Sequence, residues 1–109
     1  MKIRIEHIPL YGCLDEVEEM RVPDKIINDY DLQIGKIIDL EKFKIKISEI
    51  NESTVKLIIF DNHDVMDIER IVDYENYESI LILELNKSHN IYLPVFDAME
   101  DWTLTLINE

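Results

Sequence analysis

The densest group of potential metal ligands lies in residues 61–69. Carboxylates grouped in a loop suit calcium or magnesium, and a histidine among carboxylates suits zinc or manganese. The spacing does not match an EF-hand loop, because no glycine stands at the sixth position from Asp61 and no glutamate at the twelfth. The segment also fits a polar loop in which Asp64 caps a helix, so a metal site is one of two interpretations. Its candidate ligands are Asp61, His63, Asp64 and Asp67.

Residues for nucleophilic or acid–base catalysis do not occur in recognisable arrangements. The carboxylates that follow Cys13 disfavour the thiolate that a catalytic cysteine needs. The three histidines show neither HExxH nor HxH spacing, and no GxSxG motif or glycine-rich phosphate loop is present. His7 shares the strand parity of Ile3 and Ile5, which predicts a hydrogen-bonded histidine on a buried face. We therefore expect no enzyme, no catalytic residue and no cofactor.

Acidic segments that also carry aromatic residues form the candidate binding surface. Residues 61–109 hold twelve acidic side chains against two basic ones, whereas residues 1–60 hold twelve against nine, within a net charge of −13. Aromatic side chains beside acids can anchor a contact inside a charged rim. The predicted contact residues lie in two segments, 73–78 and 97–101, and include Trp102 directly after the second segment. They are Asp73, Tyr74, Glu75, Tyr77, Glu78, Asp97, Glu100, Asp101 and Trp102.

The acidic charge also indicates what kind of partner the chain has. Such a field repels nucleic acid and anionic membranes, and it attracts a basic partner from beyond contact distance. We expect a small protein-binding domain that neutralises or regulates a basic protein, as an immunity protein neutralises a toxin or as an inhibitor blocks a nucleic-acid-binding enzyme. Two alternatives are a metal- or ligand-binding β domain that uses residues 61–69 and a structural subunit of a larger assembly. Acidity that serves only solubility would need no partner.

The only basic cluster consists of lysines between residues 36 and 56. Most of them alternate with apolar residues in a predicted hairpin, which places them on its outer face. Phe43 has the opposite parity, so the aromatic side chain that would stack on bases of single-stranded nucleic acid is missing. The pattern predicts a solvated sheet face whose lysines also discourage edge-to-edge aggregation.

The single cysteine excludes an intrachain disulfide, and no apolar run approaches membrane-spanning length. The tetrapeptide that ends at Cys13 resembles a lipobox. However, the residues before it alternate between apolar and polar types, as in a strand and not as in a signal peptide. We expect a cytoplasmic protein. The abundance of Ile, Lys and Asn is typical of A/T-rich coding genomes, such as those of low-GC bacteria.

The apolar residues that must form the scaffold favour strands, because nineteen are isoleucine and one is alanine. Short helices are expected at residues 14–20 and 64–74, and a loop at 24–31. Strands 42–47 and 54–60 should pair as one hairpin, and 80–85 and 91–95 as another. Past Lys56, strand 54–60 is apolar on both faces, so both faces should be at least partly covered. Seven strands are expected, at 2–8, 32–40, 42–47, 54–60, 80–85, 91–95 and 102–107.

This organisation predicts a single domain that spans residues 1–109. We expect a mainly β fold: a small antiparallel β-sandwich or open barrel of about seven strands with one or two short helices. The alternative is an α+β fold in which a helix covers an antiparallel sheet.

Overall fold

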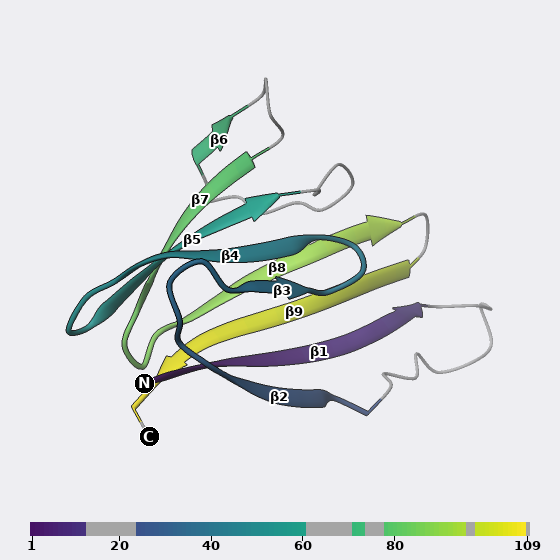
Figure 1. Cartoon of the computed structure of the whole chain (residues 1–109). Helices are drawn as coiled ribbons and strands as arrows, with labels where there is room; N and C mark the ends of the chain where they lie inside the picture. Colours follow the sequence, from purple (N-terminus) through teal and green to yellow (C-terminus); the bar gives the residue numbers. More distant parts are fainter. Residues whose placement is uncertain (13–23, 61–70, 74–77, 96–97, 109) are drawn as a thin grey trace.

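The computed structural model describes residues 1–12, 24–60, 71–73, 78–95 and 98–108, which form nine strands (Figure 1). Their bounds are β1 Lys2–Gly12, β2 Ile26–Asp31, β3 Ile37–Asp39, β4 Lys44–Ile50, β5 Thr54–Phe60, β6 Ile71–Asp73, β7 Glu78–Glu84, β8 Ser88–Val95 and β9 Ala98–Ile107. They build two antiparallel sheets. The first sheet has the order β2-β1-β9-β8, and the second has the order β3-β4-β5-β7-β6.

The inner faces of the two sheets share one apolar core. Alternating residues of β1 and β9 point inward from the first sheet, and alternating residues of β4, β5 and β7 point inward from the second. Phe43 and Trp102 are the largest fully buried side chains. Burial of each Ile or Leu side chain contributes about 1.5–3 kcal/mol relative to exposure, so this shared core is what holds the sheets together.

The two sheets are joined at one end, where β7 continues into β8. Leu85 forms an isolated parallel bridge with Leu106, and the backbone N–H of Asn86 donates to the carbonyl oxygen of Leu106 over 2.8 Å. Asn86 has a φ of 62°, a left-handed conformation that asparagine tolerates better than most residues. Both chain termini lie at this end, which we call the joined end (Figure 1).

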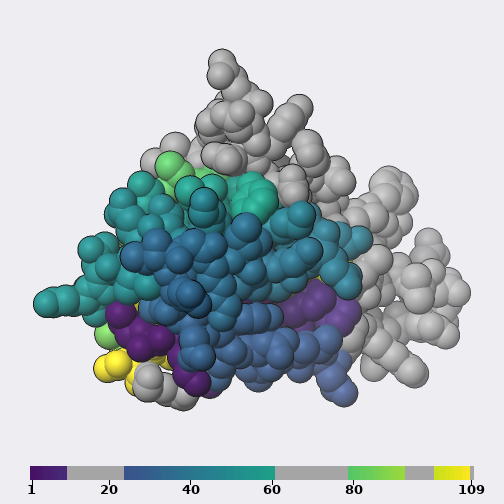
Figure 2. Space-filling model, viewed as in Figure 1, coloured from purple at the N-terminus to yellow at the C-terminus, as the bar shows by residue number. Residues whose placement is uncertain are grey.

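The opposite end of the sheets is where β1, β5 and β8 finish and where β7 and β9 begin (Figure 1). The register agrees with this arrangement within each sheet. Gly12 pairs with Ala98 in the first sheet, and Ile59 pairs with Ser79 in the second. Residues of β2 to β5, blue and teal in Figure 2, cover much of the side of the molecule shown there.

The prediction of a mainly β fold is confirmed, and the first hairpin forms as expected, with Lys44 opposite Phe60 and Ile50 opposite Val55. The described residues form nine strands, whereas seven were expected for the chain. Residues 26–31, predicted as a loop, form β2 by pairing with β1. Of the predicted strand 32–40, only β3 is a strand, because the chain turns at Gly35, whose φ is 88°.

The predicted helices are not seen among the described residues. The segment 14–20 lies outside them, as does most of the segment 64–74, whose described part forms β6. No helix covers either sheet in the part of the chain that the structure describes, so the α+β alternative finds no support there. The predicted pairing of 80–85 with 91–95 is wrong, because β7 pairs with β5 and β6 while β8 pairs with β9.

No membrane-spanning helix, judged by length and apolar character, occurs within the described ranges.

Candidate protein-binding surfaces

The strand ends that flank the most acidic connections in the sequence lie at the end of the sheets opposite the joined end. The described strand ends that flank residues 13–23, 61–70, 74–77 and 96–97 all lie there (Figure 1). Together these four connections contain ten acidic side chains against two basic ones, a net −8 of the total −13. The short β3–β4 connection at the same end adds Glu41 and Lys42, which balance each other. We call this the acidic end.

The predicted contact residues are only partly described. Tyr74, Glu75, Tyr77 and Asp97 lie outside the described residues. The backbones of Asp73 and Glu78 pair with each other where β6 meets β7. Asp101 is half-buried in β9 opposite Tyr92. The described strand ends therefore bring both predicted segments, 73–78 and 97–101, to the acidic end.

Trp102 is a core residue and not an exposed anchor, which corrects the predicted contact set. Its side chain is fully buried and packs edge-on against Phe43, with ring centroids 4.9 Å apart and an interplanar angle of 88°. The parity of β9 explains the burial, since Trp102 lies on the same face as Leu104 and Leu106. The indole Nε1 is buried without a hydrogen-bond partner.

Glu100 is also removed from the acidic surface, because it is turned inward and is only 7% exposed. Its Oε2 lies 2.5 Å from Nε2 of His7, and the His7 ring stacks on Trp102 with centroids 5.1 Å apart. The predicted hydrogen-bonded histidine on a buried face is thus confirmed. His7 therefore has a structural role, because its ring packs against the Trp102 indole and contacts the Glu100 carboxylate.

The candidate metal ligands Asp61, His63, Asp64 and Asp67 all lie outside the described residues. Among the residues that are described, no three His, Cys, Asp or Glu side chains are grouped so that they could hold a metal ion.

A shallow pocket of about 250 Å³ lies beside the β7–β8 turn. Small-molecule sites usually enclose roughly 300–1,000 Å³ and bury most of their ligand, so this depression does not suggest a cofactor site. It is lined by Ile82, Leu83, Glu84, Lys87, Ser88 and His89.

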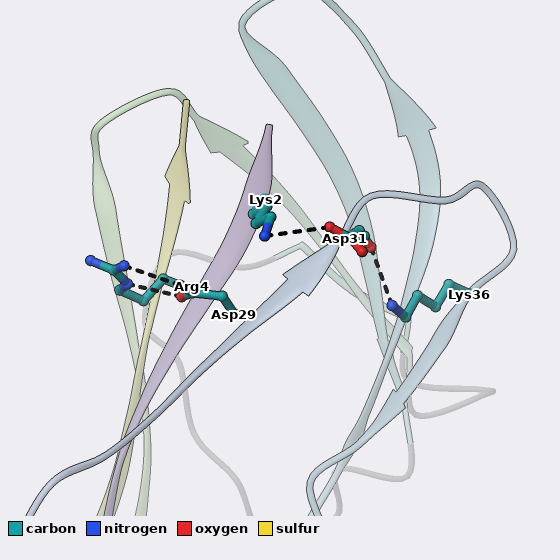
Figure 3. A network of polar contacts seen from close by, with 5 residues as sticks. All are labelled: Lys2, Arg4, Asp29, Asp31 and Lys36. Atoms are coloured by element: carbon teal, nitrogen blue, oxygen red, sulfur yellow. Dashed lines mark hydrogen bonds and ion pairs between the residues drawn. The ribbon is translucent and has the colours of Figure 1, made fainter. Parts of the chain in front are cut away.

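Ion pairs tie β2 to β1 across their outer face (Figure 3). Arg4 donates two hydrogen bonds to Asp29, from Nε to Oδ1 over 2.9 Å and from Nη2 to Oδ2 over 3.1 Å. Lys2 lies 3.7 Å from Asp31, and Lys36 donates to the backbone carbonyl of Asp31. Because basic side chains neutralise its acids, β2 does not add to the acidic surface.

The Arg4–Asp29 pair predicts a measurable pH response. Its hydrogen bonds, and then its charge, hold the pKa of Asp29 below its ordinary value. A carboxyl with a lowered pKa adds stability above its unfolded pKa and loses it as the pH falls through the folded value. We expect the NMR titration midpoint of Asp29 to rise in the Arg4→Gln variant. An unchanged midpoint would show that the pair does not form in solution.

Exposed isoleucines are the surface feature that sequence reasoning missed. Ile37, Ile80 and Ile82 are 55%, 37% and 62% exposed on the outer face of the second sheet. The sequence signal was present, because strands 54–60 and 80–85 are apolar on both faces. Such a pattern indicates strands that are covered on both sides.

Comparisons with known proteins name no family for this chain. No protein-family model matches the sequence, and neither the search of curated proteins nor the search of solved structures found a match.

Proposed function

We propose that this chain is a protein-binding domain that neutralises or regulates a basic partner through its acidic end. The observation that carries the proposal is the position of the strand ends, which bring four connections with a net charge of −8 to one end of the sheets. A positively charged partner would be attracted to this end from beyond contact distance. Immunity proteins and inhibitors of nucleic-acid-binding enzymes work in this way.

Electrostatic attraction and close packing would play separate roles. Long-range attraction raises the association rate, whereas a few desolvated anchors set the dissociation rate. With Trp102 in the core, the aromatic residues proposed as anchors are Tyr74 and Tyr77. Asp73, Glu75, Glu78, Asp97 and Asp101 are the acids proposed to surround them.

Two variants with equal charge changes test where the partner binds. The acidic-end variant carries Glu75→Gln, Glu78→Gln and Asp97→Asn. The joined-end variant carries Glu49→Gln, Glu52→Gln and Glu84→Gln, three exposed positions near the β4–β5 and β7–β8 turns. Each immobilised protein is incubated with host lysate at low salt, and bound protein is eluted with salt.

We expect one basic protein to be retained by the wild type and by the joined-end variant, and to be lost from the acidic-end variant. Equal loss from both variants would mean that net charge alone attracts proteins, and it would contradict a dedicated surface. Retention by both variants would place the contact elsewhere. Either result would overturn the proposal.

A further inference from the structure

The edge strands of the two sheets differ in how well they are protected from pairing with another strand. Within the described ranges, β2 and β8 lie at the edges of the first sheet, and β3 and β6 at the edges of the second. Proteins usually shorten an edge strand, interrupt it with proline or place lysine on it, because its outward backbone N–H and C=O groups are unpaired. β3 and β6 have three residues each, and β8 contains Pro94, which has no N–H. β2 has six residues and neither a proline nor a lysine, so it is the least protected of the four.

β2 also runs along β1 without interruption. The register is continuous from Lys2 opposite Asp31 to His7 opposite Ile26. Because side chains alternate along a strand, Ile26 lies on the inner face with His7, and Ile27 lies on the outer face. Ile26 is 48% exposed and Ile27 is 54% exposed. A strand added beside β2 would therefore find an apolar side chain on each face of the sheet.

The charges around this edge balance, although the chain as a whole carries −13. β1, β2 and the flanking residues 24–25 and 32–36 contain four basic and four acidic side chains. Figure 3 shows five of these eight side chains and the contacts between them. A neutral edge does not attract a basic protein, and a second copy of this acidic chain meets less repulsion here than at the acidic end.

We propose that β2 pairs with β2 of a second copy of this chain, antiparallel about a two-fold axis perpendicular to the sheet. The two four-stranded sheets then join into one continuous sheet. With the axis at Asn28, Ile26 of each copy stands opposite Tyr30 of the other. In the same register, Lys25 stands opposite Asp31. These pairs set an aliphatic against an aromatic side chain and a base against an acid, and the symmetry forms each pair twice.

The charged pair across the axis is compatible with the ion pairs inside each copy. The ammonium of Lys25 has three donors and uses one of them on Glu6, over 3.3 Å. Asp31 lies 3.7 Å from Lys2, yet its side chain is 81% exposed and can accept from a second cation. Moving the axis by one residue, to Asp29, would instead set two carboxylates opposite each other.

The antiparallel arrangement also keeps the two acidic ends apart. β2 begins at the acidic end and runs towards the joined end (Figure 1). Two antiparallel β2 strands therefore place the acidic ends at opposite ends of the joined sheet, where both stay uncovered. The dimer thus goes beyond the proposed function, and salt distinguishes the two. Salt weakens the attraction of a basic partner, whereas it should strengthen the dimer, because it screens the repulsion between two copies that each carry −13.

Sedimentation velocity tests the dimer with charge-matched variants. At about 200 µM and physiological salt, a Kd of tens of µM or tighter gives mostly dimer. The edge variant is Ile27→Glu, which places a carboxylate opposite Asp29 of the other copy. The control is Ile82→Glu, because Ile82 is 62% exposed on β7 of the other sheet. We expect the wild type and the control to sediment at twice the 13.0 kDa of one chain, and the edge variant to sediment as a monomer with unchanged circular dichroism.

A charge exchange tests the register. Lys25→Glu sets like charges opposite each other across the axis and is expected to weaken the dimer several-fold. Adding Asp31→Lys restores a pair of opposite charges and should restore the wild-type Kd. Adding Glu52→Lys instead, in the β4–β5 turn, restores only the net charge and should leave the dimer weak.

Three results would overturn the proposal. A wild type that stays monomeric would leave the β2 edge to a strand of another protein. A dimer that Ile82→Glu abolishes and Ile27→Glu does not would place the contact on the second sheet. Equal rescue of Lys25→Glu by the two second substitutions would show that net charge, and not pairing between β2 strands, controls the association.

Discussion

Replacing Trp102 by alanine is expected to lower the free energy of unfolding by about 3–5 kcal/mol, as large-to-small changes in a packed core do. The indole is fully buried and contacts the Phe43 ring edge-on and the His7 ring face-on. Its removal leaves a cavity between the two sheets and takes away both ring contacts. The free energy of unfolding of a whole domain is only about 5–15 kcal/mol. This single substitution therefore removes a large part of the stability of the domain.

The matched control is Trp102→Phe, which keeps an aromatic ring in the core and removes the buried Nε1 that has no hydrogen-bond partner. We expect a loss of about 1–2 kcal/mol, because a smaller ring packs less well but one unsatisfied donor is gone. Urea unfolding followed by far-UV circular dichroism measures both variants, since Trp102 is the only tryptophan and fluorescence would be lost. A loss below about 1 kcal/mol for Trp102→Ala would indicate an exposed indole.

The association rate with the captured basic partner is expected to fall at least about tenfold between low and physiological salt. The screening length shrinks from about 30 Å at 0.01 M to about 8 Å at 0.15 M, so the field of the acidic end no longer reaches an approaching partner. The dissociation rate should change much less, because it depends on desolvated contacts. Stopped-flow or surface plasmon resonance measurements over a salt series give both rates. A salt-independent association rate would contradict electrostatic attraction.

Local alternation explains why the β4–β5 hairpin and the buried face of β1 could be predicted from the sequence. In β4, Ile45 and Ile47 are buried and Lys46 is exposed, as the period of two requires. The same reasoning placed His7 on the inner face of β1. Such features depend on neighbours in the sequence, so one strand contains enough information to predict them.

Features set by distant residues could not be predicted in the same way. Ile26 to Asp31 does not alternate and becomes a strand through pairing with β1, aided by the Arg4–Asp29 ion pair. The turn after β7 looks like a hairpin turn, yet the Leu85–Leu106 bridge carries the chain into the other sheet. Both outcomes depend on contacts between segments that are far apart in the chain.

The candidate surface was only partly predictable from the sequence. The clustering of acids in the sequence identified the two candidate segments. It could not show that both segments belong to the same end of the sheets, because this depends on the directions of the strands. Trp102 was assigned to the surface by its acidic neighbours, although its parity with Leu104 and Leu106 indicated the core. The exposed isoleucines of β7 were not predicted, because a strand sequence that is apolar on both faces does not show whether another element covers the outer face.

The most direct test of the acidic end is the association rate of the two charge-matched variants with the captured partner at low salt. Both variants lose three negative charges, so they differ only in where the charge is lost. We expect the acidic-end variant to associate several-fold more slowly than the wild type, and the joined-end variant to stay close to the wild-type rate. Equal rates for the two variants would contradict the claim that the acidic end is the binding surface.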